Sequence, residues 1–423
     1  MKTYPLKTII ANAKALSPYY HLLYKNISNN GEWKLETLPL VEQKSFWDSN
    51  SIKENQLLTG EVSDGIVFKS GGTTGDPKFS AYTRMEWETM TGTFGQHFAE
   101  NGLKTGDKVA NLFYVGELYA SFIFLSDTIE RCPVDVTIFP ISGSAPAEFI
   151  LNTIRDFNIN VVLCVPTTIM TLADYIHAHQ IEGIHLEKIY FGGETMYEDQ
   201  RLHLQKIFPG VEIRSVGYAS VDAGLLGYAD DSCDFNEHRQ FDNHHIIEII
   251  DEESGEPIQE VNKKGKIYCT NLSRLLMPII RYPVGDNGIW VENEGTKNRK
   301  FKILGRSEEG ARIGPVTFYM EDFQHILKKF ENRFNVSNTQ MLIEHFEHRD
   351  SLCLRIAVQD IPTDLPGLNR EIIEMVYKER HMLEEEVRKG KIHPVQIQWL
   401  SSGELEINKR TGKLLQIIDR RFK

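Results

Sequence analysis

Short, continuously apolar segments alternate in the first half of the chain with segments whose apolar residues recur at helical spacing. The apolar segments are residues 66–68, 108–114, 161–165 and 188–191, and the clearest helical pattern covers residues 85–101. Strands that are apolar on both faces are typical of parallel sheets buried between layers of helices. The pattern therefore predicts a large N-terminal domain of the α/β class.

The pattern changes after about residue 243, where shorter strands follow one another without intervening helices. Strands are expected at residues 246–250, 265–270 and 288–291, separated by turn residues such as Ser254 and Gly255. We interpret residues of about 243–300 as a β subdomain of a first domain that covers residues 1–306.

A separate α+β domain is predicted for residues 307–423, joined to the first by a hinge. Its pattern indicates a helix near residues 319–330 and strands near 339–346 and 351–358. One long charged helix is expected over residues 368–388, followed by a strand at 395–399. A unit of this size can fold around its own core.

Composition and charge indicate that neither nucleic acid nor a membrane is the partner of this protein. The formal net charge is −12 and the pI is near 5.7, so nucleic acid is not expected as a partner. The five cysteines are scattered and form no CxxC pair, and no apolar run has the length of a transmembrane helix or a signal peptide. The sequence predicts a reduced, cytoplasmic protein with no membrane partner.

The strongest chemical signal is a loop of small, hydroxyl-bearing and glycine residues that follows an apolar strand. Backbone N–H groups and hydroxyls in such a loop can close around phosphate oxygens, and a lysine adds positive charge. Pro77 stands where a Walker A loop needs glycine, so kinases and GTPases of that type are excluded. A solvent-exposed turn is the alternative interpretation. The loop consists of Ser70, Gly71, Gly72, Thr73, Thr74, Gly75, Asp76, Pro77 and Lys78.

This loop resembles the phosphate-binding signature of the adenylate-forming superfamily, and further motifs of that superfamily follow it in order. The similarity spans nearly the whole chain and is greatest to the phenylacetate–CoA ligase branch. The matching motifs are Phe191-Gly192-Gly193-Glu194, Tyr218-Ala219-Ser220-Val221-Asp222, Arg281-Tyr282-Pro283-Val284-Gly285-Asp286, Gly305-Arg306 and Gly412-Lys413.

The resemblance implies ATP-dependent activation of a carboxylic acid, with an aryl acid favoured, to acyl-AMP and pyrophosphate, followed by transfer to CoA. It implies that the Ser70–Lys78 loop binds phosphates, that Gly193, Glu194 and Tyr218 line the adenine, and that Ala219 and Ser220 contribute to the nucleotide site. Asp286 would accept hydrogen bonds from the ribose, with Arg306 beside it. The catalytic residues implied are Lys413, as a cation, and Asp222, which would hold the Mg²⁺ of ATP.

The motifs also depart from the superfamily pattern at two neighbouring positions. Val221 stands in place of a threonine, and Asp222 stands in place of a glutamate, whose side chain is one methylene longer. The segment around them is similar to proteins of phenazine antibiotic biosynthesis, which leaves a carrier thiol or a reductase open as the acyl acceptor. A degenerate, non-catalytic nucleotide-binding protein is a second alternative. A homodimer follows from the resemblance alone.

Two weaker features complete the set of candidates. Cys233, His238, His244 and His245 crowd together, but they do not form a zinc-ligand pattern, and a partly exposed loop is the favoured interpretation. His345 and His348 are expected on a polar face at a strand end. The acid is expected to bind near residues 139–143, where aromatic and small residues suit a flat substrate.

Overall fold

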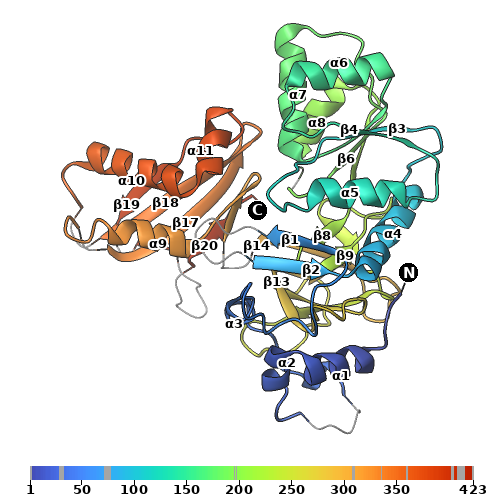
Figure 1. The fold of residues 1–423 in the computed structure, drawn as a ribbon. Helices are drawn as coiled ribbons and strands as arrows, with labels where there is room; N and C mark the ends of the chain where they lie inside the picture. The colour runs from blue at the N-terminus through green and yellow to red at the C-terminus, as the bar shows by residue number, and fades with distance from the viewer. Residues whose placement is uncertain are drawn as a thin grey trace. The chain divides into compact units, whose positions relative to one another are not determined.

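The structure is a computed structural model that describes residues 2–27, 33–70, 78–194, 196, 198–306, 310–334, 336–358, 361–401, 404–406 and 415–421. The described chain divides into two compact units, one ending at Leu304 and the other beginning at Gly305. Figure 1 gives the order of their helices and strands.

A five-stranded parallel sheet forms the first layer of the N-terminal unit. Its strand order is β4-β3-β5-β6-β7, so the chain crosses over between neighbouring strands through helices. The strands are β3 (Lys108–Asn111), β4 (Thr137–Pro140), β5 (Val161–Cys164), β6 (Lys188–Phe191) and β7 (Glu212–Ser215). The predicted α/β class is confirmed.

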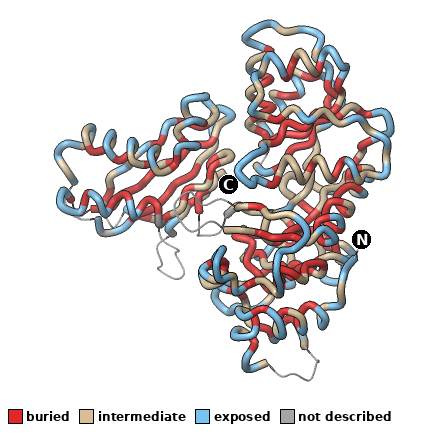
Figure 2. The backbone as a smooth tube through the Cα atoms, viewed as in Figure 1, coloured by how far each residue is buried: buried red, intermediate tan, exposed pale blue. Residues whose placement is uncertain are grey.

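Helices cover both faces of this sheet because successive strand residues point to opposite faces. Val162 and Ile189 pack on one face with the helices that follow β4, β5 and β6, whereas Val161 and Tyr190 pack on the other face with α4 and α5. Figure 2 shows the strands buried between the helices. The helices are α4 (Arg84–Glu100), α5 (Ser121–Glu130), α6 (Ala147–Phe157), α7 (Pro166–His179) and α8 (Glu198–Ile207).

Local sequence signals set the ends of these helices. Thr83 and Glu86 form a capping box at the start of α4, in which each side chain accepts a hydrogen bond from the other residue's backbone N–H. Asn158 ends α6 in the left-handed conformation, with φ of 52°. Pro166 occupies the first turn of α7, where its missing N–H costs no helical hydrogen bond.

An antiparallel five-stranded sheet, in the order β10-β14-β13-β12-β11, forms the second layer of this unit. Two short hairpins, β1–β2 and β8–β9, accompany it. The bounds are β1 (Ile66–Ser70), β2 (Lys78–Tyr82), β8 (Tyr218–Ser220), β9 (Gly224–Gly227), β10 (Glu237–Arg239), β11 (His245–Ile250), β12 (Gly265–Asn271), β13 (Tyr282–Trp290) and β14 (Lys300–Arg306). Strand β13 begins well before the expected strand at residues 288–291, so that expectation was too short.

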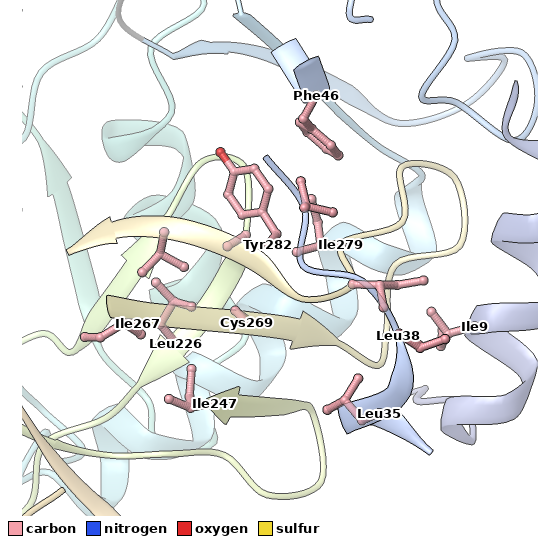
Figure 3. Close-up of a cluster of buried hydrophobic side chains, with 14 of the residues drawn as sticks. Ile9, Leu35, Leu38, Phe46, Leu226, Ile247, Ile267, Cys269, Ile279 and Tyr282 are labelled. Carbon is pink, nitrogen blue, oxygen red and sulfur yellow. The ribbon is translucent and has the colours of Figure 1, made fainter. Parts of the chain in front are cut away.

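The N-terminal helices share a hydrophobic core with the antiparallel sheet. Ile9, Leu38 and Phe46 pack in this core with Ile267 and Tyr282 of the sheet (Figure 3). The elements are α1 (Leu6–Leu16), α2 (Pro18–Leu23), the 3-10 turn η1 (Leu35–Thr37) and α3 (Gln43–Asp48). This packing brings α3, from the start of the chain, next to the first residues of β13.

The C-terminal unit is an α+β fold built on a four-stranded sheet in the order β19-β18-β17-β20. Helices α9, α10 and α11 pack with this sheet and with the hairpin β15–β16 around a core of its own. The bounds are β15 (Ala311–Ile313), β16 (Val316–Phe318), α9 (Met320–Lys328), β17 (Val336–Phe346), β18 (Arg349–Val358), α10 (Leu365–Glu379), α11 (His381–Arg388), β19 (Gln396–Leu400) and β20 (Ile417–Asp419).

The single long helix expected over residues 368–388 is wrong, because Arg380 separates α10 from α11. Arg380 has φ of −132° and ψ of 71°, outside the helical region. Its buried guanidinium donates to the Asp322 carboxylate of α9 and lies over the Tyr319 ring. This tertiary ion pair interrupts a segment whose local pattern favours continuous helix. No helix in the described part of the chain is long and apolar enough to cross a membrane.

Candidate active site

The carboxyl ends of the parallel strands bring the predicted adenine-binding segments together. Gly192 follows β6 and Val216 follows β7, and the Val216 N–H donates to the Phe191 carbonyl (2.8 Å). A Cβ atom on Gly192 would lie 2.4 Å from a Val216 methyl group, so only glycine allows this approach. Ligands of open α/β sheets bind at this edge, outside the carboxyl ends of the strands.

The carboxylate of Glu194 points to the neighbouring helix. Its Oε2 accepts hydrogen bonds from the Thr167 backbone N–H (3.1 Å) and from the Thr167 hydroxyl, at the first turn of α7. An acidic side chain at a helix N-terminus is stabilised by the exposed N–H groups and the helix dipole. Glu194 therefore fixes the Gly192–Gly193 segment against α7, and Gly193 continues it with φ of 77°.

Tyr218 and Asp286, predicted for adenine and ribose respectively, are in direct contact. The Tyr218 hydroxyl donates a hydrogen bond to Asp286 Oδ2, which joins β8 to β13. The Tyr218 ring lies 5.7 Å from the His238 ring and 6.1 Å from the Phe301 ring, which position it from the side of the antiparallel sheet. Two motifs separated by more than sixty residues in the sequence thus form one surface.

Asp222 lies in the turn between β8 and β9, with its carboxylate held by three donors. Oδ1 accepts from the Ser220 hydroxyl (2.5 Å) and the Ala223 N–H (3.0 Å), and Oδ2 accepts from the Tyr282 hydroxyl (2.6 Å). An ionised carboxylate offers about four acceptor positions, so the described residues leave one position on Oδ2. Ala219, between Tyr218 and Ser220 on β8, is exposed.

Arg274 fixes the backbone of this turn and is a site residue that the sequence analysis did not identify. Its buried guanidinium donates to the Asp222 and Ala81 carbonyls (2.6 Å for Ala81) and stacks 3.8 Å above the Tyr82 ring. The Tyr82 hydroxyl donates to the Val221 carbonyl (2.7 Å). Burial raises the pKa of Tyr82 to about 12, so this donor keeps its proton. Arg274 lies outside every motif named in the sequence analysis, and its role becomes visible only from these contacts.

The candidate phosphate loop begins and ends on adjacent positions of a hairpin. Ser70, at the end of β1, pairs with Lys78, at the start of β2. The Lys78 ammonium lies 5.5 Å from the Trp47 ring of α3, within range of a cation–π interaction. Gly71, Gly72, Thr73, Thr74 and Gly75 lie outside the described residues, so their roles stay predictions.

Of the two basic residues predicted for the site, Arg306 of the hinge is described only in its backbone and Lys413 of the tail is not described. Arg306 ends β14, and its side chain lies outside the described part of the structure. Lys413 also lies outside the described residues. The two positions that flank its segment, Glu406 and Leu415, are joined by a backbone hydrogen bond of 3.1 Å and are both bound by the Gln340 amide.

The expected acid-binding segment follows β4 at the same edge of the parallel sheet. A Cβ on Gly143 would lie 2.3 Å from the Leu112 carbonyl oxygen and 3.3 Å from the Tyr114 ring, so the segment packs tightly against the end of β3. Ser142 has φ of 74°, a left-handed conformation that few residues other than glycine adopt. Phe139 packs against Phe157 of α6 with ring centroids 5.2 Å apart.

The partly exposed loop expected around Cys233 is wrong for two of the histidines, which are buried in strands. His238 and His245 are buried on β10 and β11, and burial lowers their pKa values to about 4 and about 3, so both are neutral near pH 7. His345 lies at the end of β17, as expected, and donates to the Asp350 carboxylate (2.8 Å), although its side chain is largely buried. No group of three or more histidine, cysteine or acidic residues in the described part of the chain could hold a metal ion.

Sequence comparison finds relatives among acid ligases. The phenylacetate–coenzyme A ligase of Thermus thermophilus is 24% identical over 338 residues, which cover 76% of this chain and 73% of the relative. The indoleacetate–lysine synthetase of Pseudomonas savastanoi is 26% identical over 257 residues, or 59% of this chain and 58% of that protein. No family profile matches the chain.

Solved structures show the same fold. The 2-hydroxyisobutyryl-CoA ligase bound to its acyl-AMP and CoA has a TM-score of 0.71 at 16% identity and covers 98% of this chain and 88% of its own. The amide bond synthetase McbA of Marinactinospora thermotolerans has a TM-score of 0.55 at 14% identity, over 82% of this chain and 67% of its own.

The sequence relatives and the shared fold together identify an AMP-forming acid ligase. The chain is similar in sequence to phenylacetate–CoA ligases and similar in fold to an acyl-CoA ligase. The expected resemblance to phenylacetate–CoA ligases, the fold class and the enzyme class are confirmed. The similarity to phenazine antibiotic proteins stays a prediction.

Proposed function

We propose that this protein activates an aryl carboxylic acid with ATP and then transfers the acyl group to CoA. In the first step a carboxylate oxygen attacks the α-phosphorus of ATP, and the bond from that phosphorus to the β-phosphate oxygen breaks to release pyrophosphate. In the second step the CoA sulfur attacks the acyl carbonyl and AMP leaves. The observation that carries the proposal is the contact between Tyr218 on β8 and Asp286 on β13, which joins the motif expected to bind adenine to the motif expected to bind ribose.

The residues of the first unit support binding of the nucleotide. The Tyr218 ring offers a flat face for adenine, and the Asp286 carboxylate has the chemistry to accept hydrogen bonds from ribose hydroxyls. Glu194 holds the Gly192–Gly193 segment, which is expected to line the adenine, through its bond to α7. Lys78 supplies a cation at the end of the phosphate loop, close to where pyrophosphate would leave.

Two anions must approach each other in the first step, so cations are needed at the reacting centre. We assign Lys413 to the substrate carboxylate and α-phosphate, and Arg306 to a position near the ribose. The remaining acceptor position of Asp222 fits Mg²⁺, which binds carboxylate and phosphate oxygens and would neutralise charge on the ATP phosphates. The Val221 side chain offers no hydroxyl to the α-phosphate, so this contact is absent from the proposed site.

The decisive experiment is acid-dependent exchange of pyrophosphate into ATP in the presence of Mg²⁺, across phenyl, phenolic, phenazine and fatty acids. Exchange with an aryl acid is expected. Exchange with fatty acids alone would contradict the aryl assignment, and ATP binding without exchange for any acid would favour the non-catalytic alternative.

The acyl acceptor needs a second assay because the sequence relatives use different acceptors by name. Phenylacetate–CoA ligases transfer to CoA, whereas the indoleacetate–lysine synthetase joins its acid to lysine. Consumption of the acyl-adenylate should be followed with CoA, lysine and a carrier-protein thiol in parallel, and CoA is expected to react fastest. A cytoplasmic location and a homodimer are further parts of the proposal, the latter testable by light scattering.

A further inference from the structure

A buried tyrosine connects the start of the chain to the candidate magnesium carboxylate. Tyr282, the first residue of β13, is fully buried, and its hydroxyl lies 3.0 Å from Trp47 Nε1, 3.4 Å from Gln43 Nε2 and 2.6 Å from Asp222 Oδ2. Gln43 and Trp47 are one helical turn apart on α3, so both reach the same hydroxyl. These contacts lie within the N-terminal unit.

The chemistry of the partners sets the direction of each hydrogen bond. The indole and amide N–H groups of Trp47 and Gln43 can only donate, so they occupy the acceptor positions of the Tyr282 hydroxyl. An ionised carboxylate can only accept, so the hydroxyl proton points to Asp222. No other arrangement of donors and acceptors gives the Tyr282 hydroxyl a hydrogen bond with all three partners at once.

The same network limits what Asp222 can offer to a ligand. The Ser220 hydroxyl and the Ala223 N–H fill the positions on Oδ1, and Tyr282 fills one position on Oδ2. Among the residues that the structure describes, no other donor uses the second position on Oδ2. The charged hydrogen bond from Tyr282 also prevents rotation of the carboxylate, because any rotation would break a bond that is stronger than a neutral one.

We propose that Tyr282 is a positioning residue that orients Asp222, so that Oδ2 binds the Mg²⁺ of ATP through its one remaining lone pair. Gln43 and Trp47 fix the tyrosine in turn. Asp222 is one methylene shorter than the glutamate usual in the superfamily. The hydrogen bonds fix the orientation of its carboxylate, so that one oxygen lone pair can bind the metal. This inference rests on the proposed function for the identity of the nucleotide.

The test is the dependence of ATP binding on Mg²⁺ concentration, followed by calorimetry with the full chain and without any acid. Tyr282→Phe keeps the ring and removes the hydroxyl. We expect the Mg²⁺ concentration needed for half-maximal binding to rise by on the order of tenfold, as for other residues that orient metal ligands. ATP affinity in EDTA should not change.

Tyr20→Phe is the matched control. Tyr20 lies in the same core, and its hydroxyl donates to the Pro278 carbonyl (3.0 Å) and accepts from the Ile280 N–H (3.2 Å). Tyr20→Phe also removes a buried hydroxyl, but one whose partners are backbone groups. The Mg²⁺ dependence of ATP binding in this variant should equal that of the wild type. An equal change in both variants would show a general structural effect and overturn the proposal.

A folded Tyr282→Phe protein with unchanged Mg²⁺ dependence would also overturn the proposal. If that variant does not fold, Trp47→Phe decides, because it removes one donor to Tyr282: a rise in the Mg²⁺ requirement supports the role and an unchanged requirement refutes it. Failure of the proposed function is separate, since it would appear as wild-type protein that binds Mg²⁺ and ATP but exchanges no pyrophosphate with any acid.

Discussion

The Tyr218 hydroxyl donates a hydrogen bond to the Asp286 carboxylate, and this contact links the strand expected to face adenine with the strand expected to face ribose. Tyr218 stands on β8 and Asp286 on β13, so the bond spans two separate sheets. The relationship makes the two residues a pair whose contributions to nucleotide binding can be separated by mutation.

Asp286→Ala is expected to weaken ATP binding by roughly tenfold or more, because a hydrogen bond to a charged group contributes about 1.5–3 kcal/mol. Tyr218→Phe keeps the aromatic face and frees one acceptor of Asp286, so a smaller loss is expected. Fluorescence titration with an ATP analogue measures both. A loss in Tyr218→Phe as large as that in Asp286→Ala would contradict the separate roles.

Lys413→Ala is expected to lower acid-dependent pyrophosphate exchange by about 10²-fold, the usual cost of one group that stabilises transition-state charge. ATP binding should change little. Lys378→Ala, an exposed lysine on α10 of the same unit, is the matched control and should exchange as the wild type does. Full activity in Lys413→Ala would refute the assignment of that lysine.

Arg281 illustrates a motif residue whose contacts are structural. Its guanidinium forms two hydrogen bonds with the buried Glu248 carboxylate (2.9 and 3.1 Å) and also donates to the Leu38 carbonyl (2.5 Å). Burial raises the pKa of Glu248, and the charge of Arg281 opposes this. The pair thereby attaches the N-terminal segment to β13.

Arg281→Met should lower the free energy of unfolding by about 3–5 kcal/mol, because it leaves a buried carboxylate without its cation. The double variant Arg281→Met with Glu248→Leu should recover much of this loss, since it removes both charges. Chemical denaturation of the two variants measures the difference. Equal instability in the single and double variants would show that the ion pair is not the cause.

Acid should destabilise the fold through its buried histidines. Burial lowers the pKa of His245 to about 3, and that of His238 to about 4, below the ordinary value of 6.5. The unfolded chain therefore binds more protons than the folded chain below about pH 6.5. The contribution of these neutral histidines to the free energy of unfolding is therefore fully present above about pH 6.5. It declines as the pH falls toward 3, by at most about 1.4 kcal/mol per pH unit for each histidine.

His245→Gln isolates one of these contributions. Glutamine cannot titrate, but its amide can replace the hydrogen bond of 2.7 Å that His245 forms with the Leu226 carbonyl. The variant should lose less stability than the wild type between pH 6.5 and 4, as measured by denaturation at several pH values. Parallel pH profiles for the two proteins would contradict this role of His245.

The sequence by itself determined the class of the N-terminal domain and the nucleotide motifs. Continuous apolar strands and helical spacing are local properties, so β5 and β6 and helix α4 could be predicted close to their observed bounds. The nucleotide motifs are short, ordered strings that need no tertiary contact to be identified. The sheet register then explains why the segments after β6 and β7 meet at one edge.

Only the tertiary structure decided which residues hold these motifs in place. Arg274 and Tyr282, which bind Asp222, lie about fifty and sixty residues after it in the sequence. Trp47, which donates to the Tyr282 hydroxyl, lies far before it. Arg380 breaks a predicted helix because its side chain pairs with Asp322. Hydrogen bonds and ion pairs between distant residues leave no periodic pattern in the sequence, because they depend on how the strands and helices pack, so their partners become visible only in the folded chain.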